Sequence, residues 1–271
     1  MIPLVASGLL GAVLRFAGRP AIGPRLAAAG VGLGILAAYG VAVGLPPAPP
    51  VLSLDKIAYL AAAGLVGGVL IDLARLPAFM RWLGFAVLLA AALYWMAEPR
   101  ADLSHPWRLV GLASLWIVGL VTLWRSEASR NAGMDPVIKL FAAAIGVGLV
   151  AMIGDAGTQA KLAFATAAAL AGFLILNWPA TRYPWNAALL LGAQGFLLSL
   201  ITGLALFSTA SLPALAILTL VFFADVAVQH INLGSGKLAR AAHPWVLGGL
   251  SLIPVLAAIA VAQMQSSITG G

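Results

Sequence analysis

Long runs of apolar residues alternate with short polar gaps along the whole chain. Most runs approach the roughly 20 residues that a helix needs to cross the hydrocarbon core of a bilayer. Proline-rich stretches such as GLPPAPP (44–50) and NWPATRYPW (177–185) lie between runs, where a helix cannot continue unbroken. The pattern therefore predicts ten transmembrane helices. Their expected bounds are Ile2–Phe16, Leu26–Leu45, Ile57–Leu73, Trp82–Ala97, Trp107–Trp124, Val137–Gly154, Leu162–Trp178, Trp185–Phe207, Leu212–Ile231 and Trp245–Met264.

Composition leaves no room for a soluble part. Of the 271 residues, 62% are hydrophobic and only 8% are charged, against roughly a quarter charged in soluble domains. The mean hydropathy of +1.05 is spread along the chain, and no segment is long and polar enough to fold in water. We therefore expect an all-α polytopic integral membrane protein, with residues 1–271 forming a single transmembrane domain whose main partner is the lipid bilayer.

The positions of the basic residues predict an orientation. When the gaps between helices are numbered along the chain, the odd gaps hold 11 of the 15 Lys and Arg, and the even gaps with the C-terminal tail hold 4. Cytoplasmic loops carry the excess of basic residues, so the odd gaps should be cytoplasmic and both termini outside the cytoplasm. We expect a bacterial inner membrane. The net charge of +7 then serves orientation, and no nucleic-acid partner is expected. The first segment is short, but without it the alternation is lost.

The phrase HPW begins two of the predicted helices, at His105 and at His243. The 138 residues between them correspond to five helices, so a duplicated five-helix unit would give an inverted five-plus-five repeat. A related YPW at Tyr183 favours a simpler reading, in which Pro and Trp are ordinary residues for a helix start at the membrane interface.

Glycine pairs at four-residue spacing predict close helix packing. Gly64 and Gly68 form one such pair, and Gly30 with Gly34 and Gly40 with Gly44 form two more. Small residues at this spacing allow helix backbones to approach closely. Packing inside one bundle is a more general use of such pairs than a dedicated dimer face.

Asp225 is the only acid well inside an apolar run, in LPALAILTLVFFADVAVQHIN (212–232). A carboxylate in hydrocarbon is costly unless it is paired, wetted or protonated, so the residue is a candidate for function. Gln229 and Asn232 follow at i+4 and i+7 and would share its helix face. Two readings stay open: Asp225 pairs with an arginine or His230 near the inner interface, or it lies in a solute or proton path.

The candidate path consists of polar residues on three predicted helices or their ends. Gln194 in the eighth segment would extend the path, and Arg15 is the expected guanidinium partner of Asp225. Ser199 and Thr202 either belong to it or join helices by hydrogen bonds. The full set is Asp225, Gln229, Asn232, Gln194 and Arg15. Two other acids, Asp72 and Glu127, are each followed at i+3 by an arginine, Arg75 and Arg130, with which they should pair.

Catalytic, metal and cofactor signatures are missing. The absence of cysteine excludes disulfides, thiolate nucleophiles and Cys-ligated metals. The histidines form no HxxxH or carboxylate–histidine helical pair, and none is placed at mid-membrane depth to ligate haem. LGSGKLAR (233–240) lacks the first glycine and the Ser or Thr of a phosphate loop. We expect no enzyme, no metal site and no cofactor.

Two functions remain for such a chain. A bundle without soluble domains or a nucleotide motif fits a gradient-driven transporter of a small molecule or ion. The alternative is a non-catalytic membrane subunit that scaffolds or stabilises a larger membrane complex, with protein partners that the sequence does not name. A polar cavity that reaches Asp225 would favour the transporter, and a solid bundle would favour the subunit.

Overall fold

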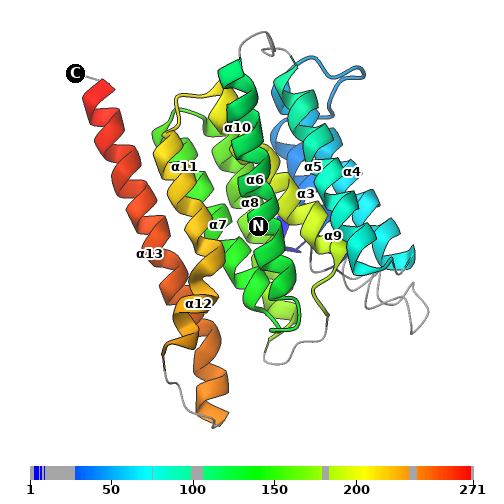
Figure 1. The fold of residues 1–271 in the computed structure, drawn as a ribbon, viewed down its shortest axis with the longest axis vertical. Coiled ribbons are helices and arrows are strands. Elements are labelled where there is room, and N and C mark those ends of the chain that lie inside the picture. The colour runs from blue at the N-terminus through cyan, green and yellow to red at the C-terminus, as the bar shows by residue number, and fades with distance from the viewer. Residues whose placement is uncertain are drawn as a thin grey trace.

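The computed structural model describes residues 3–5, 7, 9, 28–74, 76–98, 106–178, 183–231 and 237–269, and all their regular structure is helical (Figure 1). The helices are α3 (Ala29–Ala42), α4 (Ser53–Ala74), α5 (Ala78–Ala97), α6 (Pro106–Ala128), α7 (Asp135–Ile153), α8 (Gly157–Leu176), α9 (Ala187–Leu189), the π-helical segment η1 (Leu190–Gln194), α10 (Gly195–Phe207), α11 (Leu212–Leu218), the 3-10 segment η2 (Thr219–Phe223), α12 (Ala224–Gln229) and α13 (Lys237–Thr269).

Eight helices in the described part of the chain are long and apolar enough to cross a membrane. They coincide with the third to tenth predicted segments, and the shorter apolar helix α3 coincides with the second. The all-α, multi-pass class is therefore confirmed. The first predicted segment lies mostly outside the described residues, and α3 has only 14 residues, so the first and second predicted crossings stay predictions.

Helix starts follow local chemistry. Asp135 and Pro136 open α7, where an acid and a missing backbone N–H are both favourable. Ser211 caps α11 by accepting a hydrogen bond from the backbone nitrogen of Ala214 at 3.2 Å. Helix α13 differs from its prediction because it begins at Lys237 rather than Trp245 and contains Pro244 and Pro254. Membrane helices tolerate such prolines when neighbouring groups satisfy the freed backbone.

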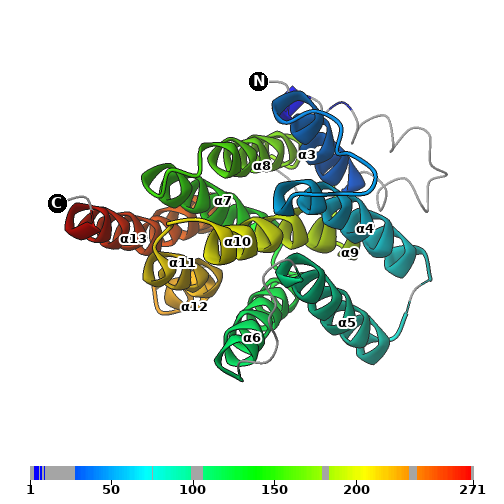
Figure 2. The same cartoon turned by 90° about the horizontal axis from the view of Figure 1, so that it is seen from above.

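The core lies around α7, which packs against α8 and α13 and buries most of its residues. Seen from above, α10 runs near the middle of the bundle, and α5 and α6 form a pair at one edge (Figure 2). Helix α4 packs along α9, η1 and α10. Tertiary burial therefore differs strongly between helices, with α7 enclosed and the α5–α6 pair on the outside.

A close backbone approach is found at Gly64 and Gly68, and also at Gly34, where a Cβ would lie 3.1 Å from the backbone nitrogen of Ser7. A Cβ at Gly64 would lie 2.6 Å from the carbonyl oxygen of Leu191, and one at Gly68 would meet the backbone of Ala187 and Ala188. Gly40 and Gly44 have open space instead. The Gly64–Gly68 face thus packs within this bundle, as the sequence predicts.

The shared HPW phrase does not mark two equivalent helix starts. Helix α6 begins at Pro106, and His105 lies outside the described residues. His243 and Pro244 lie inside α13 instead of at its first residue. The inverted repeat stays a prediction.

Candidate functional site

The span that contains Asp225 is not a continuous α-helix. It runs from α11 through the tighter 3-10 turn of η2 and returns to α-helix at α12 (Figure 1). Asp225 lies directly after this change, in the first turn of α12. Short 3-10 stretches inside a helix often mark hinges or strained sequences, and irregular backbone in a membrane must be compensated by protein groups.

Asp225 is paired with two cations from neighbouring helices. Its Oδ1 atom accepts a hydrogen bond from Arg125 Nη2 at 2.7 Å and lies 3.3 Å from Lys139 Nζ. Its Oδ2 atom lies 3.0 Å from Ser129 Oγ, which also lies 2.9 Å from the carbonyl oxygen of Arg125. We call Asp225, Arg125, Ser129 and Lys139 the Asp225 cluster. It ties the end of α6 and the start of α7 to α12.

Lys139 is the most enclosed member of the cluster. Its side chain is 0% exposed, against 15% for Asp225 and 14% for Arg125. The ammonium donates hydrogen bonds to Ser129 Oγ at 2.9 Å and to the carbonyl oxygen of Phe222 at 3.3 Å. Because an isolated buried ammonium is very costly, these oxygens and the Asp225 carboxylate are what make its position stable.

Two aromatic rings lie close to the Arg125 guanidinium group. The guanidinium carbon lies 5.1 Å from the ring centroid of Phe223 and 5.7 Å from that of Trp124. Both distances are within the range of cation–π attraction. The rings keep the pair largely away from solvent, which strengthens its electrostatic attraction.

Asp135 and His243 extend the charged region toward α13. Asp135 precedes Lys139 by one helical turn on α7, and its Oδ1 atom lies 3.5 Å from His243 Nδ1. Asp135 is buried, whereas the His243 side chain is 39% exposed. The charged region therefore reaches from the buried cluster to a partly exposed histidine on a fourth helix.

A separate polar cavity of about 440 Å³ lies at the same ends of the helices. Four polar residues line it, together with Ile71, Leu76 and Pro184: Asp72 on α4, Arg81 on α5, Arg130 after α6 and Asn186 before α9. The volume is in the range of small-molecule sites. We call it the Arg81–Arg130 cavity.

Glu127 joins the two arginines of the cavity. Its Oε1 atom lies 3.2 Å from Arg130 Nη1 and 3.5 Å from Arg81 Nη2. The predicted i+3 pairing of Glu127 with Arg130 is confirmed, with Arg81 as a second partner that sequence spacing could not reveal. One carboxylate thus serves two guanidinium groups.

Asp72 acts as a cap for another helix. Its carboxylate oxygens accept hydrogen bonds from the backbone nitrogens of Ala187 at 3.1 Å and Ala188 at 2.9 Å. The side-chain oxygen of Asn186 accepts a third capping hydrogen bond, from the backbone nitrogen of Leu189 at 2.9 Å. The predicted partner of Asp72, Arg75, lies outside the described residues. The role that the structure assigns to Asp72 is to fix the start of α9 against α4.

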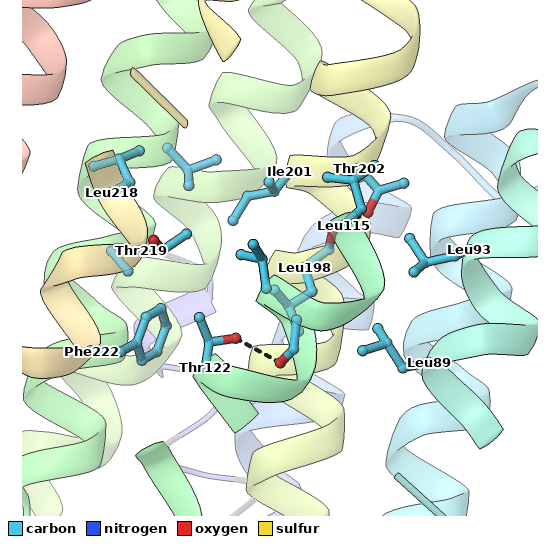
Figure 3. Close-up of a pocket in the computed structure, with 14 residues that line it drawn as sticks. Leu89, Leu93, Leu115, Thr122, Leu198, Ile201, Thr202, Leu218, Thr219 and Phe222 are labelled. Carbon is cyan, nitrogen blue, oxygen red and sulfur yellow. Dashed lines mark hydrogen bonds between the residues drawn. The ribbon is translucent and has the colours of Figure 1, made fainter. Parts of the chain in front are cut away.

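A much smaller apolar cavity of about 30 Å³ lies between α5, α6, α7, α10 and the α11–η2 segment (Figure 3). Thr122, Thr202 and Thr219 line it, but their hydroxyl groups donate to carbonyl oxygens of their own helices. Phe222 lines the same cavity, and its carbonyl oxygen accepts a hydrogen bond from Lys139 Nζ. This space has about the volume of one water molecule and borders the Asp225 cluster.

The other predicted path residues are not part of the cluster. Gln229 is exposed at the end of α12, and Arg15 and Asn232 lie outside the described residues. His230 Nδ1 lies 2.8 Å from the carbonyl oxygen of Val226 on its own helix. The arginine partner found in the described residues is Arg125.

Gln194 occupies a second irregular helix segment. It lies in the π-helical turn η1 and is fully buried. Within the described part of the chain, neither its Nε2 nor its Oε1 atom has a hydrogen-bond partner. Ser199 and Thr202 bond to carbonyl oxygens of their own helix. π-Helical turns recur at functional sites, which keeps Gln194 a candidate without linking it to Asp225.

Sequence reasoning found Asp225 but missed its partners. In the sequence, Arg125, Lys139 and Arg81 indicate only orientation, as bases of the odd gaps, and Arg130 is predicted only as the partner of Glu127. One signal was present for Lys139: it follows Asp135 at i+4, with the apolar residues Val137 and Ile138 between them. Such spacing places an acid and a base on one helix face.

The fold and the site together define a multi-pass integral membrane protein with buried charged residues at one end of its spans. No protein-family model matches the chain, and a search of curated proteins found no significant match. Function must therefore be argued from the site itself.

Proposed function

We propose that the protein is a gradient-driven transporter of a small solute that carries a negatively charged group. The observation that supports this most is the Arg81–Arg130 cavity, whose volume suits such a solute and whose polar lining comes from α4, α5 and the ends of two other spans. Polar and ionisable groups are rare inside membranes and concentrate on solute and ion paths.

The hydrogen-bond donors at the cavity favour an anion. Arg81 and Arg130 share a single carboxylate, Glu127, so this group of three carries one positive charge in excess. Asp72 contributes a negative charge that balances this excess, but its two oxygens already accept backbone hydrogen bonds. The donors left for a solute belong mainly to the guanidinium groups, which bind carboxylate or phosphate oxygens well.

Two spans with an irregular helical turn support a transport function. The α9–η1–α10 span contains a π-helical turn, and the α11–η2–α12 span contains a 3-10 turn. Transporters commonly bind solutes and ions where spanning helices are discontinuous. The Asp225 cluster would hold the ends of α6, α7 and α12 together in one state of the cycle.

Uptake into proteoliposomes tests this function. The panel should contain labelled small carboxylates, an amino acid and inorganic phosphate, measured with and without a pH gradient. We expect uptake of at least one solute above that of protein-free vesicles. Arg130→Gln should lower that uptake about tenfold or more, because it removes one charged partner of the solute and leaves the Arg81–Glu127 pair in place.

Lys161→Gln is the matched control, because Lys161 is an exposed base in the first turns of α8 and does not line the cavity. It should transport normally. A correctly folded protein that moves no solute of the panel would contradict the proposal and favour a non-catalytic subunit of a larger complex.

We place the cavity on the cytoplasmic side, because its residues come from the third, fifth and seventh gaps of the predicted topology. The chain has no native cysteine, so single cysteines can be labelled selectively. An impermeant maleimide added to intact cells should label Leu52→Cys and leave Ala132→Cys unlabelled until the membrane is opened. Both positions are exposed. The reverse pattern would invert the orientation.

A further inference from the structure

The surroundings of the Lys139 ammonium consist of oxygen atoms from three different segments. Ser129 Oγ follows α6, the Phe222 carbonyl oxygen belongs to the 3-10 turn η2, and Asp225 Oδ1 belongs to α12. Their distances from Nζ are 2.9, 3.3 and 3.3 Å. The side chain of Lys139 extends from α7 and is fully buried. Its terminal ammonium group is the part that contacts these oxygens.

A hydroxyl, a carboxylate and a backbone carbonyl from an irregular helix are the groups that bind hard cations in membrane carriers. We propose that these three oxygens form a binding site for a monovalent alkali-metal cation, and that the Lys139 ammonium is its built-in occupant. The covalently attached charge takes the position that a free sodium or potassium ion would hold. The wild-type protein then needs no such ion for its fold.

Charge balance supports the binding of a free metal cation in place of the Lys139 ammonium. Among the side chains that the structure describes, the charged region has two carboxylates, Asp225 and Asp135, and two groups that are always or normally cationic, Arg125 and Lys139. His243 faces Asp135, at 3.5 Å, and contributes a third positive charge only when it is protonated. Removing the Lys139 ammonium leaves one negative charge in excess with neutral His243. A buried excess charge of this kind attracts a counter-ion.

One consequence concerns transport and rests on the proposed function. If Lys139 permanently fills the cation site, solute uptake by the wild type should be equal in sodium, potassium and N-methyl-D-glucamine chloride. The site itself does not depend on transport, because it can be tested by thermal stability alone.

Two substitutions of Lys139 distinguish the effect of removing the positive charge from the effect of opening space for an ion. Lys139→Ala removes the ammonium and leaves room between the three oxygens, whereas Lys139→Met removes the charge and keeps most of the volume. In both variants the 2.7 Å bond to Arg125 should keep the Asp225 carboxylate in position. The unfolding temperature of each purified variant is measured in sodium, potassium and N-methyl-D-glucamine chloride at equal ionic strength.

For Lys139→Ala we expect sodium or potassium to raise Tm by about 2–4 °C over N-methyl-D-glucamine when the cation is at about five times its dissociation constant. Wild type and Lys139→Met should show no difference among the three salts. Adding Ser129→Ala to Lys139→Ala removes one of the oxygens and should reduce the shift.

An equal Tm of Lys139→Ala in all three salts would overturn the cation site. Failure of both single variants to fold in every salt would overturn it too, because the ammonium itself would then be required. A salt-dependent Tm in a protein that transports nothing would keep the site and reject only the transport function.

Discussion

Asp225→Asn is expected to destabilise the protein by about 3–5 kcal/mol, the usual result of removing one partner from a buried ion pair. Asp225 holds Arg125 at 2.7 Å and Lys139 at 3.3 Å, and both cations are largely or wholly enclosed. Asparagine keeps the shape and one acceptor oxygen but leaves two buried positive charges near a single remaining carboxylate, Asp135. The amount of monodisperse protein after detergent extraction, and its Tm, measure the loss.

A second substitution provides the control for Asp225→Asn. Adding Lys139→Met removes one of these two cations and leaves Arg125 with Asp135, so the double variant should recover most of the folded protein. Recovery would assign the loss to charge rather than to packing at α12. A single variant as stable as the wild type would instead mean that water already solvates these cations, and the cluster would not hold the helices together.

Gly68→Ala is expected to be the most damaging glycine-to-alanine change on α4. The new Cβ would meet the carbonyl oxygen of Ala187 and lie 2.6 Å from the Cα of Ala188. Both atoms belong to backbone that the Asp72 cap holds in place. Overpacking of this kind costs about 1–3 kcal/mol, and here the rigid neighbour favours the upper end, beyond the roughly 1 kcal/mol that alanine gains in helix propensity.

The adjacent Gly67 supplies a matched control. A Cβ there would meet only the side-chain atom Cδ1 of Leu88, at 3.4 Å, which is ordinary contact. Gly67→Ala should therefore leave Tm unchanged or raise it slightly, whereas Gly68→Ala should lower it by several degrees. Equal Tm values for the two variants would contradict the close approach of α4 and α9.

The spanning helices could be predicted because each depends on residues that are neighbours in the chain. A run of apolar residues of the right length becomes a membrane helix whatever lies beside it. The predicted start of α13 at Trp245 is wrong, and the reason is also local. Pro244 is typical of a helix start, but in the structure it lies inside the helix. Proline fixes one backbone angle and removes one donor, and both effects are compatible with either position in a membrane.

The partners of Asp225 could not be predicted in the same way. Arg15 and Arg125 each lie at the end of a predicted helix on the same side, and sequence distance does not determine which helix packs against α12. The count of basic residues also gave no indication that Lys139 is buried. Such a count predicts on which side of the membrane a base lies, but not which way its side chain faces. Helix neighbours are decided by packing across the bundle, which no local pattern contains.

The charged residues at the C-terminal end of α6 hold this helix to the bundle. In the spanning part of α6 only 22% of residues are buried, against 67% in α7, so lipid rather than protein surrounds most of its length. Lipid tails are as apolar as leucine, and apolar contact alone does little to hold such a helix to the bundle. Its last turn is different: Arg125 and Ser129 fasten it to α12 and α7, and Glu127 fastens it to Arg81 on α5. Helix α6 is therefore held to the bundle mainly by ionic bonds at its C-terminal end, with the hydrogen bond from Trp116 Nε1 to the carbonyl oxygen of Ala86 as a further attachment to α5.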